Sequence, residues 1–356
     1  MQIRKYRLMV IEGDGIGPEL IESALDVLQA VEKAVGGFQF DIEVHEGGAG
    51  LFKREGYAFS EKSLMQASEF DAILKGPVGD PSLRLADGTE ASSISGILRN
   101  GLDLFANVRP ITLLPTIQGV RGRQSEDIDY VIVRENTEGL YASRGKGIGN
   151  DRVMNDILML TRDGVERIAR FAFKLAMERS LNRSSNTATV TCVDKSNVLR
   201  TMAFFRKIVT EVSSEFPEIT LEYIYSDACA QAMVLSPEKF DVLVMENFLG
   251  DLLSDLGGAT VGGIGLCHSG NYGHTAAYFE PIHGTAPDIA GKNLANPLSQ
   301  IRCLELIFEK LGELDARNKL YDAICSSLRS GKFKLDGQGC PSDGTVKATK
   351  SIIQCL

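Results

Sequence analysis

Two aspartates four residues apart, Asp251 and Asp255, follow a short apolar segment that ends at Met245. Residues at this spacing on a helix face the same side. Two like charges so placed repel each other unless a cation lies between them, and carboxylate oxygens suit Mg²⁺ or Mn²⁺. A third aspartate, Asp227, follows another strand-like segment and could complete the set. Spacing alone leaves two interpretations open, a metal site and a solvated acidic face of a helix.

Three arginines are candidates for binding the carboxylates of a substrate: Arg99, Arg109 and Arg134. Arginine offers a planar fork of N–H donors that matches a carboxylate, so three that converge would suit a polyanionic acid. Each of them taken singly is more typical of a protein surface. Their convergence is therefore a hypothesis for the structure to test.

Tyr141 and Lys195 are candidates for proton transfer. Both side chains titrate far from neutrality in water. A nearby metal and cationic neighbours favour tyrosinate, whereas desolvation and nearby cations favour a neutral lysine. The structural alternatives are a half-buried tyrosine and a lysine that caps a helix.

A glycine-rich turn, Gly13 to Pro18, directly follows a strand pattern and opens a helical one. Its spacing is G-x-G-x-G, which differs from the G-x-G-x-x-G of Rossmann dinucleotide sites. The proline suits the first turn of a helix. The motif predicts a tight turn whose glycines let the backbone approach a ligand, with an ordinary strand-to-helix turn as the alternative.

A second segment, from Glu280 to Lys292 with Asn296 shortly after it, is dense in glycine, proline and small residues. It carries His283 and Asp288. Such a loop can wrap an adenosine, with the imidazole against the base and the carboxylate accepting hydrogen bonds from the ribose hydroxyls. An acidic residue there would repel a 2′-phosphate. A purely structural turn is the alternative.

The elements that must position these residues follow from the apolar pattern. Short apolar segments such as Leu8–Ile11 and Val131–Val133 alternate with longer helical patterns such as Val165–Met177. This alternation is typical of an α/β fold with a largely parallel sheet. A length of 356 residues allows about two domains with substantial cores.

The composition of the chain limits the binding partners and the cellular location that we expect. The net charge of −9 is not gathered into any block, which disfavours nucleic acid and anionic membranes. Seven cysteines scattered singly fit reduced thiols better than disulfides or a zinc site. No apolar run approaches the roughly 18 residues that cross a bilayer, and none resembles a signal-peptide core. We expect a cytoplasmic protein, or an organelle-matrix protein if a transit peptide has been removed.

Taken together, these motifs resemble the β-decarboxylating dehydrogenases, the family of isocitrate, 3-isopropylmalate, homoisocitrate and tartrate or D-malate dehydrogenases. The resemblance covers nearly the whole chain, and the motifs stand in the family's order. They are Gly13 to Glu19, Leu98-Arg99, Leu104 to Pro110, Arg134 to Tyr141, Asp194 to Asn197, Asp227, Asn247 to Leu256, and Glu280 to Lys292.

The resemblance implies an α/β isocitrate/isopropylmalate dehydrogenase-like fold of two domains, distinct from the Rossmann fold, with an active-site cleft between them. The large NAD-binding domain is expected to be discontinuous, formed by residues 1–104 and 262–356. Residues 105–261 would form the small domain, with a dimer interface and a clasp. A homodimer with shared sites follows, in which Lys195 and Asp227 reach the site of the partner subunit.

The resemblance also implies the reaction and the role of each residue. The reaction is NAD-dependent, Mg²⁺- or Mn²⁺-assisted oxidative decarboxylation of a (2R)-2-hydroxy acid that bears a 3-carboxylate. Lys195 would accept the hydroxyl proton and Tyr141 would protonate C3. The metal ligands would be Asp227, Asp251 and Asp255; the substrate-binding residues Ser93, Ser95, Arg99, Arg109 and Arg134; and the cofactor-binding residues Ile16, Asn197, Glu280, His283, Gly284, Ala286, Asp288, Ile289 and Asn296.

The helix before Arg99 selects the substrate in the family. Ser93 matches the serine that isocitrate and homoisocitrate enzymes use, whereas Ser95 replaces the asparagine common in isocitrate enzymes and Gly96 is smaller than usual. The leucine pair of bacterial isopropylmalate enzymes is missing. We therefore expect a polar 3-substituent of the isocitrate or homoisocitrate type, with 3-isopropylmalate or tartrate/D-malate as the alternative.

Two rival functions come from other classes. A non-catalytic regulatory subunit of this family would be expected to have lost one of the catalytic or metal-binding residues, and all five are present. A metal-dependent decarboxylase or lyase that uses no dinucleotide is the other rival. It would show no binding of NAD or NADH.

Overall fold

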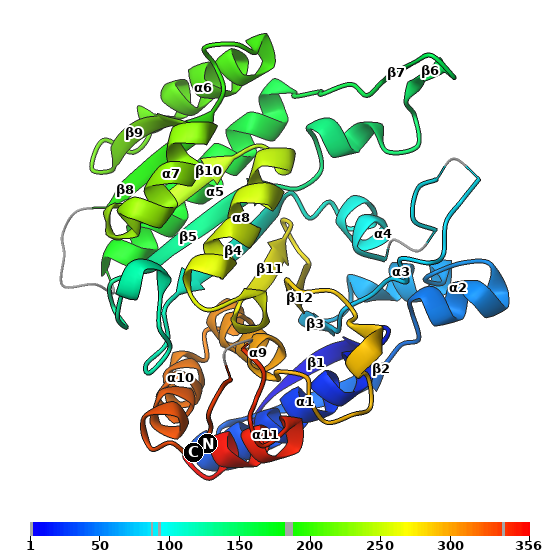
Figure 1. Cartoon of the computed structure of the whole chain (residues 1–356), viewed down its shortest axis with the longest axis vertical. Coiled ribbons are helices and arrows are strands. Elements are labelled where there is room, and N and C mark those ends of the chain that lie inside the picture. Colours follow the sequence, from blue (N-terminus) through cyan, green and yellow to red (C-terminus); the bar gives the residue numbers. More distant parts are fainter. Residues whose placement is uncertain (1–2, 87, 92–93, 182–187, 337–338) are drawn as a thin grey trace. The chain divides into compact units, whose positions relative to one another are not determined.

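The computed structural model describes residues 3–86, 88–91, 94–181, 188–336 and 339–356, and within them the chain has the mixed α/β fold that the sequence predicts. Contacts divide it into two compact units (Figure 1). Unit 1 comprises residues 1–103, 114–117 and 262–356, and unit 2 comprises residues 104–113 and 118–261. The catalytic and metal-binding candidates all lie in unit 2, whereas most of the cofactor-binding candidates lie in unit 1.

The strands of unit 1 run in the order β2-β1-β3-β12-β11. Neighbouring strands are parallel except β11, which is antiparallel to β12. All four residues of β3 are buried, as expected for a strand covered on both faces. The strands are β1 (Arg4–Ile11), β2 (Phe38–Val44), β3 (Ala72–Lys75), β11 (His268–Tyr272) and β12 (Ala277–Pro281).

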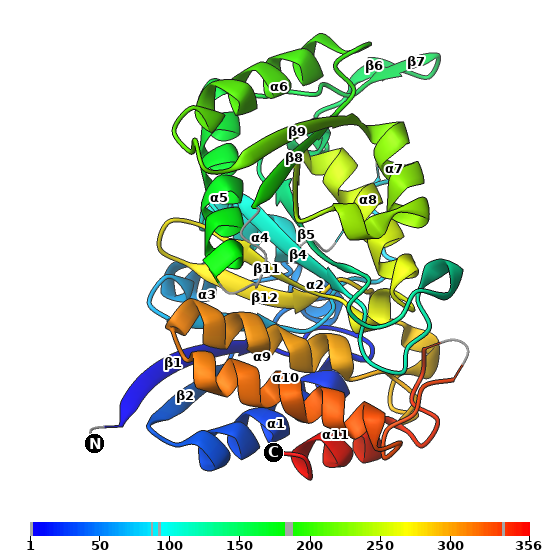
Figure 2. The same ribbon diagram turned by 90° about the vertical axis from the view of Figure 1, so that its left-hand side faces the viewer.

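Helices of unit 1 bury apolar stripes against its strands. In α1 the apolar side chains Leu20, Ala24, Val27 and Val31 return every three or four residues and are fully buried. Helices α9 and α10 run side by side (Figure 2). The helices are α1 (Gly17–Val35), α2 (Ala49–Glu55), α3 (Glu61–Ala67), α4 (Ile94–Gly101), α9 (Leu298–Leu311), α10 (Leu314–Arg329) and α11 (Thr345–Ile353).

The strands of unit 2 run in the order β4-β5-β10-β8-β9, with only the β4–β5 pair antiparallel. A separate hairpin joins β6 to β7. The strands are β4 (Ala106–Thr112), β5 (Asp129–Glu135), β6 (Ile148–Asn150), β7 (Val153–Asn155), β8 (Thr189–Asp194), β9 (Thr220–Tyr225) and β10 (Val242–Met245), and the helices are α5 (Arg162–Leu181), α6 (Arg200–Ser213), α7 (Ser226–Leu235) and α8 (Asn247–Thr260).

The parallel strands of unit 2 end at one edge of its sheet, which is where chemistry-bearing residues follow. Arg134 lies opposite Met245 in the β5–β10 pair, and Asp194 lies opposite Tyr225 in the β8–β9 pair. Lys195 comes directly after β8. Carboxyl ends of parallel strands are the usual place for ligands in α/β proteins. No helix in the described part of the chain is long and apolar enough to span a membrane.

Candidate active site

Asp251 is the centre of a charged cluster in unit 2. Its Oδ1 accepts a hydrogen bond from Arg134 Nη1, and its Oδ2 accepts one from the Tyr141 hydroxyl at 3.0 Å. Arg109 lies 3.5 Å from Asp251 through Nη2 and 3.5 Å from Asp255 through Nη1. The structure therefore brings together five of the residues singled out in the sequence.

Three polar side chains accept hydrogen bonds from Arg109 and Arg134. The Oδ1 of Asn247 accepts from Arg134 Nε at 3.0 Å and from Nη2 at 2.8 Å. Asn107 Oδ1 accepts from Arg109 Nε at 2.7 Å, and Ser254 Oγ accepts from Arg109 Nη1 at 2.6 Å. All three side chains are buried. Sequence reasoning did not assign them, although Asn247 lies within the motif quoted for the aspartates.

Titration behaviour in the cluster follows from these contacts. Partial removal from water raises the pKa of Asp255 and the neighbouring Asp251 raises it further, while Arg109 and Arg134 oppose the rise. Burial and then Asp251 also raise the pKa of Tyr141, and Arg134 only partly offsets them. The expected push of cationic neighbours towards tyrosinate is thus outweighed here. The phenol form that results is suited to donating a proton.

Lys195 and Asp227 form a second charged group in unit 2. Lys195 Nζ lies 2.8 Å from Asp227 Oδ1, and this hydrogen bond is the main reason why the pKa of Asp227 is lowered. The Asp227 side chain is 71% exposed. Among the described residues of the single chain, no three His, Cys, Asp or Glu side chains are grouped so that they could hold a metal. Asp227 therefore does not join Asp251 and Asp255 within one chain.

In unit 1, the candidates Ser95 and Arg99 on α4 are tied to Glu280 on β12. Arg99 Nη2 lies 3.2 Å from Glu280 Oε1, and Ser95 Oγ lies 3.3 Å from Glu280 Oε2. Arg99 Nε also donates to the Tyr278 hydroxyl at 3.0 Å. Ser93, the other candidate on this segment, lies outside the described residues.

Glu280 also pairs with Lys75, a fully buried lysine that sequence reasoning missed, at 2.8 Å. Burial would raise the pKa of Glu280, but Lys75 and Arg99 hold it well below its usual range. The carboxylate is thus charged and engaged within unit 1. The apolar segment ending at Lys75 is the signal that could have found it, since a buried strand ending in lysine implies a buried partner.

The glycine-rich turn packs against protein backbone. A Cβ on Gly13 would lie 2.1 Å from the Pro77 carbonyl oxygen, and one on Gly15 would lie 2.1 Å from that of Thr285. The Ile16 amide donates to the same Thr285 oxygen at 2.9 Å. The absence of side chains at Gly13 and Gly15 therefore lets this turn pack closely against backbone of the same chain, as in the alternative of an ordinary strand-to-helix turn. The turn also anchors the loop that follows β12.

That loop carries most of the cofactor-binding candidates. His283 Nδ1 contacts the Gly284 carbonyl at 2.9 Å, and removal from water lowers the pKa of the ring. Ala286 adopts a left-handed conformation, Asp288 is exposed and Ile289 packs against Ile16. A neutral imidazole and an exposed carboxylate are the groups that an adenosine site uses.

Asn296 and Asn197 are the remaining cofactor-binding candidates. Asn296 donates through Nδ2 to the Gly339 carbonyl at 2.7 Å and accepts through Oδ1 from the Leu298 amide at 3.0 Å, so both ends of its amide bond protein backbone. Asn197 is exposed in the turn after Lys195, in unit 2.

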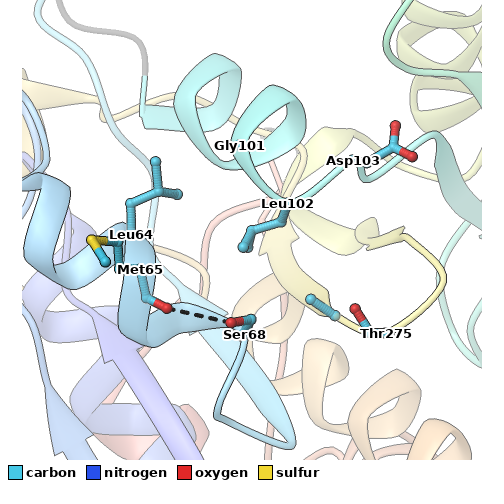
Figure 3. A pocket seen from close by; sticks show the side chains of 8 residues that line it. Leu64, Met65, Ser68, Gly101, Leu102, Asp103 and Thr275 are labelled. Carbon is cyan, nitrogen blue, oxygen red and sulfur yellow. Dashed lines mark hydrogen bonds between the residues drawn. The ribbon is translucent and has the colours of Figure 1, made fainter.

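A pocket in unit 1 is lined by Leu64, Met65 and Leu102 together with Ser68 and Thr275 (Figure 3). The Ser68 hydroxyl donates to the Met65 carbonyl at 3.3 Å, so its proton is already used within the protein. None of the candidate site residues lines this pocket.

Comparisons with known proteins agree over almost the full length. Residues 7–353 match the family described as isocitrate/isopropylmalate dehydrogenase. The chain is 39% identical over 330 residues to the 3-isopropylmalate/3-methylmalate dehydrogenase of Methanocaldococcus jannaschii, covering 92% of each. It is 36% identical over 336 residues to the 3-isopropylmalate dehydrogenase of Staphylococcus aureus, covering 93% of this chain and 94% of the relative.

Solved structures give the same picture. The structure of isocitrate dehydrogenase from Methylococcus capsulatus is similar with a TM-score of 0.86 and 34% identity, covering 98% of this chain and 99% of the other. That of a β-decarboxylating dehydrogenase from Thermococcus kodakarensis in its apo form has a TM-score of 0.79 and 36% identity, covering 98% and 96%.

Proposed function

The chain belongs to the isocitrate/isopropylmalate dehydrogenase family, and on that premise we propose that it oxidises and decarboxylates a 3-alkylmalate of the 3-isopropylmalate or 3-methylmalate class. It is an NAD-dependent decarboxylating dehydrogenase. The observation that carries the choice of substrate is the agreement with relatives named for these acids over more than nine-tenths of the chain. The expected polar 3-substituent is less well supported than its alternative.

Two features of α4 are compatible with a small apolar 3-substituent. Ser95 replaces the asparagine common in isocitrate enzymes, and its hydroxyl donates to the Glu280 carboxylate at 3.3 Å. The next two residues of the same helix are the small Gly96 and the apolar Ile97. Isocitrate is the second candidate, because the solved structure from Methylococcus capsulatus carries that name.

The residues of the Asp251 cluster fit a divalent cation. Asp251 and Asp255 are carboxylates on one helix, and carboxylate oxygens are ligands that Mg²⁺ and Mn²⁺ take in proteins. When bound there, Mg²⁺ or Mn²⁺ would draw electrons from the 2-oxygen of the substrate and stabilise negative charge that develops on it. Arg109 and Arg134 would hold the substrate carboxylates, since their guanidinium groups are fixed from behind.

Two side chains of this chain would move protons. Lys195 accepts the proton of the 2-hydroxyl as hydride leaves C2 for the nicotinamide. Tyr141 donates a proton to C3 after the carboxylate has departed as CO₂. The Tyr141 hydroxyl donates to Asp251 at 3.0 Å, which places this proton donor in the Asp251 cluster.

We propose that two copies of the chain share each site. Asp227 and Lys195 pair with each other and not with Asp251, so a three-aspartate site needs an Asp227 from another copy. Apolar side chains beside Lys195 and on the β6–β7 hairpin are exposed, as expected of surfaces that a second copy covers. They include Val198 at 69%, Ile148 at 65% and Met154 at 64% exposure.

The loop after β12 would bind the adenosine of NAD. Asp288 would accept hydrogen bonds from the ribose hydroxyls, and His283 would lie against the base. Ile16, Gly284, Ala286 and Ile289 would shape the surface around them, while Asn296 would act by fixing the end of the loop. Asn197 and Glu280 are the further candidates.

A substrate panel tests the proposal: 3-isopropylmalate, 3-methylmalate, isocitrate, homoisocitrate, tartrate and D-malate, each with NAD and Mn²⁺. We expect the highest kcat/KM for a 3-alkylmalate and loss of activity with a chelator. A decisive preference for isocitrate would overturn the choice of substrate. Undiminished turnover with chelator would refute the metal, and an inactive folded protein would favour the regulatory-subunit alternative.

A further inference from the structure

Lys195 follows Asp194, a buried aspartate that pairs with Arg206, and neither the motifs nor the proposed reaction uses Arg206. Asp194, the last residue of β8, is fully buried. Its Oδ2 accepts from Arg206 Nε at 2.6 Å and its Oδ1 from Arg206 Nη2 at 3.2 Å. Asp194 Oδ1 also accepts from the Ser196 amide at 2.7 Å. The backbone is therefore held on both sides of Lys195.

The Tyr225 ring is shared by two cations. The guanidinium carbon of Arg206 lies 5.2 Å from the centre of this ring, and Lys195 Nζ lies 5.7 Å from it. Both distances are within the range of about 6 Å over which a cation is attracted to an aromatic face. Tyr225 is paired with Asp194 across β8 and β9, so strand register places the ring beside the ion pair.

The same strand end carries Asp227. Tyr225 is the residue before α7, and Asp227 is the second residue of that helix. Lys195 Nζ pairs with Asp227 at 2.8 Å. Because Arg206 engages both oxygens of Asp194, that carboxylate is a poor competitor for the Lys195 ammonium.

We propose that Arg206 and Tyr225 are positioning residues, which present Lys195 and Asp227 as one preformed pair to the reaction. The inference rests on the proposed function, in which Lys195 accepts the substrate proton and Asp227 is a metal ligand. Arg206 acts through Asp194 and the ring, and the ring limits where the Lys195 side chain can lie. Neither residue needs to touch the substrate.

Loss of Arg206 or of the Tyr225 ring should lower kcat strongly and should affect the binding of NAD much less. A catalytic group displaced by about 1 Å costs on the order of 100-fold in rate. We expect Arg206→Gln to lower kcat about 10- to 100-fold, with KM for NAD changed less than about 2-fold. Hydride transfer should also become more rate-limiting in the variant. The primary isotope effect on kcat, measured with deuterium at C2 of the substrate, should therefore be larger in the variant than in the parent enzyme. Arg206→Lys keeps the charge but not the fork, and it should recover only part of kcat.

The ring is tested by a matched pair of variants. Tyr225→Leu removes the aromatic face and should lower kcat in the same way, whereas Tyr225→Phe keeps the face and should restore most of the loss. Tyr225 is 38% exposed, so neither variant is expected to prevent folding. Arg170→Gln is the control for a lost ion pair, because Arg170 pairs with Glu215 on the surface at 2.8 Å, and it should leave kcat unchanged.

The rates are measured on the full chain with 3-isopropylmalate, or with the best acid of the panel, together with NAD and Mn²⁺. Thermal unfolding is followed in parallel. Normal kcat and an unchanged isotope effect in both Arg206→Gln and Tyr225→Leu would overturn the inference. If Arg206→Gln does not fold, the Tyr225 pair still decides the question.

A double variant separates this inference from the proposed function. In Lys195→Met, the added Arg206→Gln change should lower kcat no further, because the group it positions is gone. A full additional loss would mean that Arg206 acts by another route and would contradict the inference. Full activity of Lys195→Met alone would refute the catalytic role of Lys195, which is a failure of the proposed function.

Discussion

At the scale of the residue, the arginines of the Asp251 cluster owe their positions to neutral side chains. Asn247 gives one carbonyl oxygen to two nitrogens of Arg134, and its Nδ2 donates to the Glu138 carbonyl at 3.0 Å. Asn107 and Ser254 do the same for Arg109. These neutral partners fix the guanidinium groups without adding to the negative charge that Asp251 and Asp255 already place beside them.

Asn247→Ala should therefore weaken substrate use. Loss of hydrogen bonds to a charged group costs roughly 1.5–3 kcal/mol, which corresponds to a fall in kcat/KM for the hydroxy acid of about 10- to 100-fold. KM for NAD should change little. The control is Asn318→Ala, which removes a surface partner of Arg317 at 3.0 Å and should have no effect. Equal kcat/KM in the parent and in Asn247→Ala would contradict the role given to Asn247.

His268 should make the protein less stable in mild acid. It is fully buried, and burial together with Arg302 and Arg317 holds its pKa well below the usual value. The unfolded chain takes up a proton near pH 6.5 whereas the folded chain does not, so the free energy of unfolding falls as the pH drops below that value.

The expected slope from this one group is up to about 1.4 kcal/mol per pH unit. Urea denaturation of the parent and of His268→Gln at pH 7.5 and pH 5.5 measures it. The variant should lose less stability between the two pH values than the parent. An identical loss in both proteins would show that His268 does not titrate as described.

At the scale of the element, the turn between β1 and α1 organises three neighbouring segments of unit 1. The Asp14 carboxylate accepts from the backbone amides of Ala49 at 2.8 Å, Gly50 at 3.0 Å and Gly79 at 2.9 Å. Gly15 and Ile16 pack and bond against Thr285, which lies in the loop after β12 that we propose binds NAD. Changes in this turn should therefore be felt where NAD is proposed to bind.

Gly15→Ala tests this turn. Gly15 has φ +58°, and a Cβ would lie 2.1 Å from a backbone oxygen that cannot move alone. We expect a loss of stability of at least about 2 kcal/mol and weaker NAD binding, from the left-handed conformation and the clash together. Gly36→Ala is the matched control, because Gly36 has φ +72° with nothing within 4 Å. Equal thermal shifts and equal NAD affinity in the two variants would rule out the proposed contact.

Strands were the elements most open to prediction from sequence. The apolar segments at Leu8–Ile11, Ala72–Leu74, Val131–Val133 and Val242–Met245 all lie in strands, because parallel strands buried on both faces need continuous apolar residues. The tight turn at Gly13 was also predictable, since its positive φ of 77° requires glycine.

Contacts between side chains that lie far apart in the sequence could not be predicted from the sequence. Lys75 meets Glu280, and Arg134 meets Asn247, only because the fold brings separate strands and helices together. Spacing along the chain encodes which residues share a face of one element, but not which elements become neighbours. The assignment of Asp227 to a metal site came from the resemblance to a family and not from geometry.

At the scale of the whole molecule, our proposal assigns each site to a pair of chains. Within the described residues of one chain, the Asp251 cluster and the Lys195–Asp227 pair are separate groups. A site assembled from two chains would make activity depend on association, so dilution below the dissociation constant of the dimer should lower specific activity. Apolar side chains on the β6–β7 hairpin are exposed, and we expect a second copy to cover them.

Mixing two inactive variants tests the shared site most directly. Asp227→Asn and Asp251→Asn should each fold but show almost no turnover with 3-isopropylmalate, NAD and Mn²⁺. If each site takes Asp227 from one chain and Asp251 from the other, a mixed dimer contains one intact site. Random mixing by unfolding and refolding together should then restore about a quarter of the parent activity. Mixtures that stay as inactive as the separate variants would contradict a site shared between two chains.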